Sequence, residues 1–383
     1  MHDKLRKVLK KALGLKTIYI IRRILLSFLQ IRDVFVARYH YMSLIISRLF
    51  KKHTALDGVE FRLKRHVLFV AEKWCDRNPA MGSSNNEHNL FGSLATSGLA
   101  TQDRFHFDEY CLQYNHTCDA ALLRLCMETK PDLLFFSWCG GRYDPKWETL
   151  SIIRRKLGIP VVAIWWEVSD IIESVLPHVN LNVVLHSSYL KKTNHPEKYL
   201  LMWTPQDSKV YYNPNIKRDI DISFIGSMNR PDRQKGIPML KDSGINVYQS
   251  GGQREYRLSI DEYARFYMRS KIALNFSCGE YWNNYNILSY IHHAKGRIFE
   301  ATLCGAMLLE AENPETRIWF EPMIDYVPFA NEVDLVEKAK YYLEHDLERE
   351  KIAANGHRKA KEKYNSEMFW RIVFTRIFGT NFQ

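Results

Sequence analysis

The stretch 296–310, GRIFEATLCGAMLLE, joins a charged helical segment to an apolar strand. Arg297 and Glu300 lie three residues apart near its start, and Cys304 and Gly305 are small enough to let a helix pack closely on a sheet. Buried charges are costly unless they are paired or used. The free backbone N–H groups at a helix start can bind an anion such as a diphosphate. The stretch is therefore either a binding site or the charged edge of an amphipathic helix.

On both sides of this stretch, short apolar runs typical of strands alternate with helical patterns. The runs are 66–70, 130–138, 160–166 and 181–188 in the first half, and 219–227, 245–252, 271–277 and 306–311 in the second. Such alternation predicts parallel βαβ units. We therefore expect an α/β protein in which two Rossmann-like domains meet near Pro205 and face an interdomain cleft.

These patterns give four expected parts. They are a basic amphipathic helical arm (1–53), an N-terminal Rossmann-like domain for the acceptor (60–205), a C-terminal Rossmann-like domain for the donor (206–364), and a C-terminal helix (365–383) that packs back on the N-terminal domain. Open parallel sheets bind ligands outside the carboxyl ends of their strands. Two such sheets facing each other can hold one substrate each.

The positive charge is concentrated in the arm. Residues 1–53 contain 13 Lys or Arg and 2 Asp or Glu, whereas the other 330 residues contain 41 of each. Leu5, Val8, Leu9 and Leu13 recur at helical spacing among lysines. This pattern favours a helix lying on an anionic membrane surface, and the alternative is an arm that packs on the body or on a partner. The neutral body argues against a nucleic-acid-binding domain.

The seven cysteines and the N-terminal hydropathy bear on the compartment. The cysteine count is odd and no pair has zinc-binding spacing, which indicates a reducing compartment. The uncharged runs of the arm are shorter than a membrane span requires. We expect a cytoplasmic protein, peripheral on the inner face of a membrane.

A second candidate site is the stretch 224–233, FIGSMNRPDR. An apolar strand runs directly into Gly226 and Ser227, and Arg230 follows. Glycine lets the backbone approach a phosphate closely, and the hydroxyl and guanidinium groups can donate hydrogen bonds to it. The alternative is an ordinary glycine between a strand and a loop.

The second half of the chain resembles the glycosyltransferase group 1 family, in its spore-maturation-protein-like branch. The resemblance rests on DIDISFIGS (219–227), on SIDEYARFYMRSKIALNFS (259–277), on the opening stretch with AENPETRIWFEP after it, and on the helical pattern up to residue 364. It implies the two-domain GT-B fold and a nucleotide-sugar donor. It does not specify the sugar.

The resemblance also implies roles for individual residues of the donor site. Glu300 is expected to bind the nucleotide ribose, and Arg297 with the loop at Gly226 and Ser227 the diphosphate. Asn275 and Ser277 are expected at a strand end beside the nucleotide.

One position departs from the family pattern. Retaining relatives carry a glutamate eight positions before the ribose glutamate, and this chain has His292 there. The departure leaves the stereochemistry open. His292, His293 and Lys295 can contact phosphate, or the two histidines can serve packing or capping.

The transfer reaction needs a stabilised leaving diphosphate and, for inversion, a base for the acceptor proton. No pair of carboxylates stands at a strand end as a metal site, so we expect a metal-independent enzyme in which Lys295, Arg297 and Arg230 supply positive charge. No cofactor is expected besides the nucleotide sugar, a co-substrate. Candidate bases are Asp170, which follows a strand, and the neighbours Glu87 and His88.

The main prediction is a glycosyltransferase acting on a glycan or lipid-linked acceptor in cell-surface polysaccharide biosynthesis. Three alternatives remain open: a nucleotide-sugar epimerase of the same architecture, a protein that binds a polyanion through the basic arm, and a sugar-binding protein without turnover.

Overall fold

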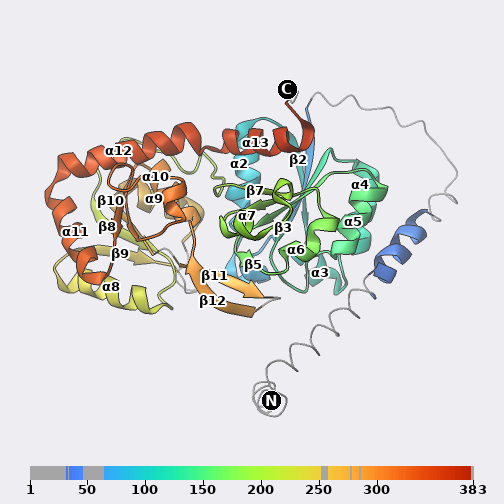
Figure 1. The fold of residues 1–383 in the computed structure, drawn as a ribbon, viewed down its shortest axis with the longest axis horizontal. Coiled ribbons are helices and arrows are strands. Elements are labelled where there is room, and N and C mark those ends of the chain that lie inside the picture. Colours follow the sequence, from blue (N-terminus) through green and yellow to red (C-terminus); the bar gives the residue numbers. More distant parts are fainter. Residues whose placement is uncertain are drawn as a thin grey trace, which may run out of the picture.

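The computed structural model describes residues 32, 34–45, 64–251, 258–276, 278–283 and 286–380 of the 383-residue chain, with side chains omitted for the strands between 278 and 290. Most of the arm, Ser277 among the predicted site residues, and residues 381–383 therefore lie outside the described part. Within that part, residues 34–45 form a helix beside the first domain (Figure 1). No helix in the described ranges is long and apolar enough to cross a membrane.

The first domain is built on a six-stranded sheet in the order β2-β1-β3-β4-β6-β7, and every pair is parallel. Side chains alternate between its two faces, so that Val67 and Phe69 pack on one hydrophobic cluster and Leu68 and Val70 on another. The strands are β1 (His66–Ala71), β2 (Thr101–His106), β3 (Leu133–Trp138), β4 (Val161–Trp165), β6 (Leu181–Val184) and β7 (Tyr199–Leu201). The helices are α2 (Ser93–Ser97), α3 (Phe107–Tyr114), α4 (Asp119–Thr129), α5 (Trp147–Lys156), α6 (Ile172–Val175) and α7 (Ser188–Lys192).

The second domain has a five-stranded parallel sheet in the order β14-β13-β10-β8-β9. The strand order reverses between β8 and β10, and ligands bind at such switch points. The strands are β8 (Ile220–Ile225), β9 (Val247–Ser250), β10 (Ser270–Asn275), β13 (Met307–Ala311) and β14 (Val327–Phe329). The helices are α8 (Pro231–Asp242), α9 (Ile260–Arg269), α10 (Gly296–Leu303), α11 (Glu332–Glu344) and α12 (Asp346–Lys363).

Two elements join the domains (Figure 1). The hairpin of β11 (Cys278–Asn283) and β12 (Asn286–His292) leaves the second domain, and β11 pairs in parallel with β5 (Val168–Ser169) of the first. The terminal helix α13 (Ser366–Phe378) packs on α2, and the Trp370 Nε1–H donates to Ser93 Oγ at 2.9 Å. The predicted arrangement of two Rossmann-like domains is confirmed.

Candidate functional site

The loops at the carboxyl ends of the two sheets contact each other directly. His293 of the second domain lies with its Nε2 2.8 Å from the backbone oxygen of Trp166, which follows β4. Glu315, which follows β13, accepts hydrogen bonds from the backbone N–H and the hydroxyl of Ser187 at 2.8 and 2.6 Å. The two ligand-binding edges therefore face each other, and α10 begins between them.

Glu300 is buried on α10. Its Oε1 accepts from Gln206 Nε2 at 3.3 Å, its Oε2 has no hydrogen-bond partner within 3.5 Å among the described residues, and the Tyr263 side chain interacts with the same carboxyl. Burial raises the pKa of Glu300 to about 7, although Tyr263, Arg297 and Gln206 act in the opposite direction. A buried polar atom without a partner carries a desolvation cost. Such a carboxyl is ready to accept hydrogen bonds from a ligand.

Gly296, the first residue of α10, allows the segment between the domains to pack closely against Glu300. A β-carbon at position 296 would lie 3.2 Å from Glu300 Oε1, 3.3 Å from Thr204 Cγ2 and 3.4 Å from Gln206 Nε2. Glycine therefore permits the segment between the domains to approach the start of α10. The sequence analysis did not identify Gln206, because its partner lies 94 residues away in the chain.

Arg297 is held by a chain of hydrogen bonds at the switch point. Its Nη1–H donates to Asn275 Oδ1 at 3.0 Å, and the Asn275 amide donates to Glu310 Oε1 at 2.8 Å. The guanidinium also lies close to Gly226, where a β-carbon would be 3.3 Å from Arg297 Cζ. The structure thus brings Arg297, Asn275 and Gly226 together, as their predicted roles require.

Glu310 is a buried acid that the sequence analysis read only as part of a strand. Burial raises its pKa to about 7, and its contact with Asn275 couples it to Arg297. Burial alone would lower the pKa of Arg297, but Tyr263, Tyr267 and Glu300 around it raise that pKa, so the guanidinium stays charged. One fixed cation therefore lies between two carboxyls that titrate near neutrality.

Arg233 holds the loop after β8 in place. Arg233 donates from Nη1 to the backbone oxygen of Ser227 at 2.7 Å, and Ser227 Oγ accepts from the Asn229 N–H at 3.2 Å. Arg230 lies 3.6 Å from Asp232, measured from Nε to Oδ1. Arg233 therefore shapes the loop, and Arg230 is engaged at the start of α8.

The segment before α10 spans both domains. The Lys295 ammonium pairs with the Glu167 carboxylate. Burial, with Lys295 nearby, lowers the pKa of His293 to about 4, so its ring is neutral and donates from Nε2 to Trp166. The side chain of His292 is exposed, and its backbone oxygen lies 2.8 Å from His186 Nε2. His293 is thus an interdomain contact, whereas the side chain of His292 lies at the surface.

The three candidate bases lie in different surroundings. Glu87 forms an ion pair with Arg104, with 2.6 Å between Oε1 and Nη1. His88 is the second residue of a π-helical turn (Glu87–Gly92), a form frequent at functional sites. Its Nε2 is buried without a partner among the described residues, and burial lowers its pKa against the charges of Glu87, Asp207 and Asp261. Asp170 is exposed directly after β5.

Glu72, which directly follows β1, belongs to the same edge and was not predicted. Its Oε1 accepts from Ser84 Oγ at 2.9 Å, and burial raises its pKa. Ser84 accepts from Asn86, Asn86 from Ser137, and Ser137 from the Trp166 indole N–H. Glu72 lies two residues beyond the apolar run 66–70, and this position at the end of an expected strand was the sequence feature that could have identified it.

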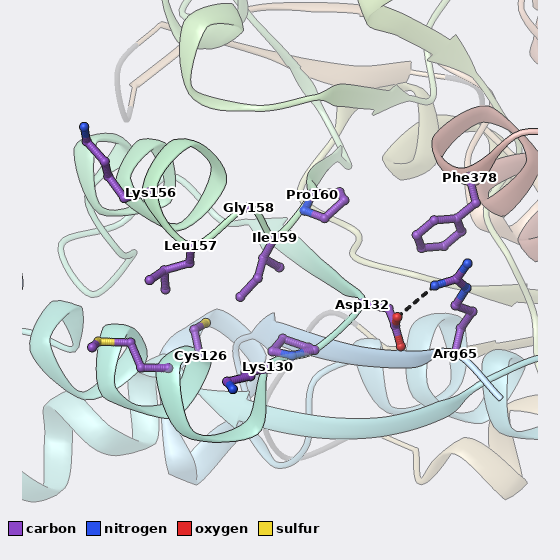
Figure 2. Close-up of a pocket in the computed structure, with 12 residues that line it drawn as sticks. Arg65, Cys126, Lys130, Asp132, Lys156, Leu157, Gly158, Ile159, Pro160 and Phe378 are labelled. Carbon is purple, nitrogen blue, oxygen red and sulfur yellow. Dashed lines mark hydrogen bonds and ion pairs between the residues drawn. The ribbon is translucent and has the colours of Figure 1, made fainter. Parts of the chain in front are cut away.

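A surface pocket of about 550 Å³ lies at the other edge of the first sheet (Figure 2). Arg65 and Asp132, which pair with each other at 3.0 Å at one end of it, precede β1 and β3, and Pro160 precedes β4. Because ligands of open parallel sheets bind at the carboxyl ends of strands, this pocket is not the candidate site. In the described ranges, no group of three or more His, Cys, Asp or Glu side chains is arranged to hold a metal ion.

The chain was compared with protein families, curated proteins and solved structures. Residues 219–371 match a family model described as "Glycosyl transferase-like". No curated protein matches the chain in sequence.

Solved structures share the architecture at low identity. A glycosyltransferase from Rickettsia africae has a TM-score of 0.55 at 9% identity, covering 84% of this chain and 100% of the other. Sucrose-phosphate synthase from Thermosynechococcus elongatus has 0.53 at 10%, covering 83% and 100%. HepE from Anabaena, in complex with UDP-glucose, has 0.51 at 12%, covering 81% and 98%. The chain has the two-domain GT-B fold, and its residues 219–371 are similar to a glycosyl transferase-like family.

Proposed function

We propose that the protein is a glycosyltransferase that moves a sugar from a nucleotide-sugar donor to a hydroxyl of an acceptor. The observation that carries this proposal is the pairing of Arg297 and Glu300 on α10. Both lie within the segment that matches the glycosyl transferase-like family model. Arg297 contacts Asn275 at the end of β10, next to the switch point, and Glu300 contacts Gln206 in the segment between the domains. The Arg297 guanidinium can bind a diphosphate, and the Glu300 carboxyl, one turn along the same helix, can accept hydrogen bonds from two neighbouring sugar hydroxyls.

The donor would bind with its ribose hydroxyls donating to Glu300 and its diphosphate beside Arg297, Gly226 and Ser227. The bond between the sugar carbon and the diphosphate oxygen breaks, and negative charge develops on the leaving diphosphate. The Arg297 guanidinium and the N–H groups at the start of α10 offset that charge. We propose that these groups act without a metal and without a further cofactor. HepE binds UDP in its solved complexes, so uridine nucleotides are the first donors to test.

The acceptor hydroxyl must lose a proton as it attacks. Among the predicted bases, His88 is the best supported. Burial lowers its pKa, which favours the neutral ring that a base requires, and its buried Nε2 has no hydrogen-bond partner among the described residues. Asp170 is the second candidate, since it lies beside the hairpin that reaches over from the donor domain. Glu87 is engaged by Arg104.

The acceptor is proposed to be a glycan or lipid-linked molecule of a cell-surface polysaccharide pathway, with the enzyme on the cytoplasmic face of a membrane. The support is the charge of residues 1–53 and the helical spacing of their leucines among lysines. Deleting residues 1–53 is expected to abolish binding to vesicles of anionic lipid, and retained binding would remove the arm from the proposal.

The test of the activity is a thermal-shift panel of nucleotides and nucleotide sugars, followed by product analysis of each stabilising donor. A transferase incubated with its donor alone releases free nucleoside diphosphate slowly, and it releases it faster when an acceptor is added. An epimerase converts the donor without an acceptor, and a sugar-binding protein is stabilised without turnover. Failure of every nucleotide to stabilise the chain would contradict the proposal.

A further inference from the structure

Helix 34–45 is fixed to the first domain by one of its faces. Ala37 is fully buried in the hydrophobic cluster that contains Leu68 and Leu123, and Tyr41 and Leu44 pack against the same cluster. The spacing of 37, 41 and 44 places the three on one side of a helix. The helix is therefore part of the first domain's packing, which Figure 1 shows as the blue segment beside that domain.

The opposite face of this helix exposes a stripe of large apolar side chains. Phe35, Tyr39 and Met42 are 69%, 71% and 52% exposed. Their spacing is again that of one helix face, and at about 100° per residue it lies opposite Ala37. Single exposed apolar residues are common on protein surfaces, whereas a continuous stripe indicates an interaction site.

Two arginines border the stripe. Arg32 and Arg38 are both exposed, and each lies about 60° from Phe35 around the helix axis, on opposite sides. A stripe of aromatic and methionine side chains between arginines suits the interface of an anionic bilayer. There the rings enter the headgroup region while long cationic side chains reach the phosphates. The charge of residues 1–53, 13 basic against 2 acidic, complements the same surface.

We propose that Phe35, Tyr39 and Met42 form a docking face that inserts into the interface of an anionic membrane, and that this face holds the acceptor domain at the lipid surface. Membrane docking by this face does not depend on the proposed glycosyltransferase function, but its consequence for the acceptor does. Because the helix is packed on the domain expected to bind the acceptor, a rigid membrane contact there favours a lipid-linked acceptor over a soluble glycan.

The test is co-sedimentation of the full chain with vesicles of phosphatidylglycerol and phosphatidylcholine, and with vesicles of phosphatidylcholine alone. The variant Phe35→Ala/Tyr39→Ala/Met42→Ala keeps helix propensity and removes the stripe. Leu347→Ala is the matched control, because Leu347 is 91% exposed on α12 of the other domain. We expect the triple variant to lose about tenfold or more in affinity for the anionic vesicles, and the control to bind like the wild type.

Several outcomes would overturn the proposal. If the triple variant bound anionic vesicles as tightly as the wild type, membrane contact would have to be made by other residues. No binding of the wild type to either vesicle would exclude a lipid partner, and concentration-dependent self-association lost in the triple variant would make the face a contact between copies. Nucleotide-induced thermal shifts, measured in parallel, report on the donor site alone, so failure of the docking face and failure of the proposed activity are distinguishable.

Discussion

At the scale of single residues, the candidate site consists of one half-buried cation, Arg297, and two buried acids, Glu300 and Glu310. Arg297 donates to Asn275, Asn275 donates to Glu310, and Glu300 faces Gln206 with one oxygen unsatisfied among the described residues. Burial raises the pKa of both acids to about 7. Such a site costs stability in the free protein, and a nucleotide can recover that cost.

The first prediction concerns Glu300 and the stability of the free protein. A carboxyl whose pKa rises on folding favours the folded state below its ordinary pKa, and that contribution is lost as the pH rises through 7. At pH 8 the cost is on the order of 3 kcal/mol. Glu300→Gln should therefore raise the unfolding free energy at pH 8 and change it little at pH 5, as measured by denaturant titration. An equal effect at both pH values would contradict the buried, titrating carboxyl.

The second prediction separates the diphosphate from the ribose. Arg297→Met removes a charged donor, and a hydrogen bond to a charged group contributes about 1.5–3 kcal/mol. We expect the affinity for a nucleoside diphosphate to fall about tenfold or more and the affinity for the nucleoside alone to change little. Glu300→Gln should weaken both ligands. Calorimetry with the two ligands distinguishes these patterns, and uniform losses for Arg297→Met would remove its diphosphate role.

Some of these residues could be predicted from the sequence and others could not. Arg297 and Glu300 share one short motif with a helix start, which sequence spacing reveals. Gln206 and Glu310 act through contacts with residues distant in the chain, and nothing in their local sequence marks those contacts. Both histidines were predicted as possible phosphate contacts, and only the structure places His293 inside the domain interface, with His292 exposed.

At the scale of elements, strand prediction succeeded where apolar runs are continuous and failed where they are not. β2 (Thr101–His106) is a polar edge strand, so it lacks the apolar alternation that marks a half-buried strand. The hairpin of β11 and β12 was missed as well. Its pairing with β5 follows from the fold of the whole chain and has no local signal.

The third prediction tests the helix that closes the chain. The Trp370 side chain of α13 is fully buried, with its ring centroid 5.6 Å from Phe69 and 5.1 Å from Phe135 of the first sheet. Trp370→Ala should cost about 3–5 kcal/mol of unfolding free energy. Met368→Ala, at a more exposed position of the same helix, should cost less than about 1 kcal/mol. Equal costs in denaturant titrations would show that α13 does not contribute to the core.

At the scale of the whole molecule, the two sheets are joined by three kinds of contact. The hairpin pairs with β5, α13 packs on α2, and the loops at the strand ends exchange hydrogen bonds through Glu315 and His293. These contacts bring the loops at the carboxyl ends of the two sheets together. Helix 34–45 packs on the first domain through Ala37, Tyr41 and Leu44, so it is distant in the chain from the proposed donor site on α10 of the second domain.

The fourth prediction tests the central claim that the start of α10 binds the donor nucleotide. It is a calorimetric titration of nucleoside diphosphates into the full chain, with Glu300→Gln and the matched control Glu337→Gln, an exposed position on α11. We predict saturable binding of at least one nucleoside diphosphate to the wild type and the control, and affinity at least about tenfold lower for Glu300→Gln. Equal affinities for all three proteins, or no nucleotide binding by the wild type, would contradict the account.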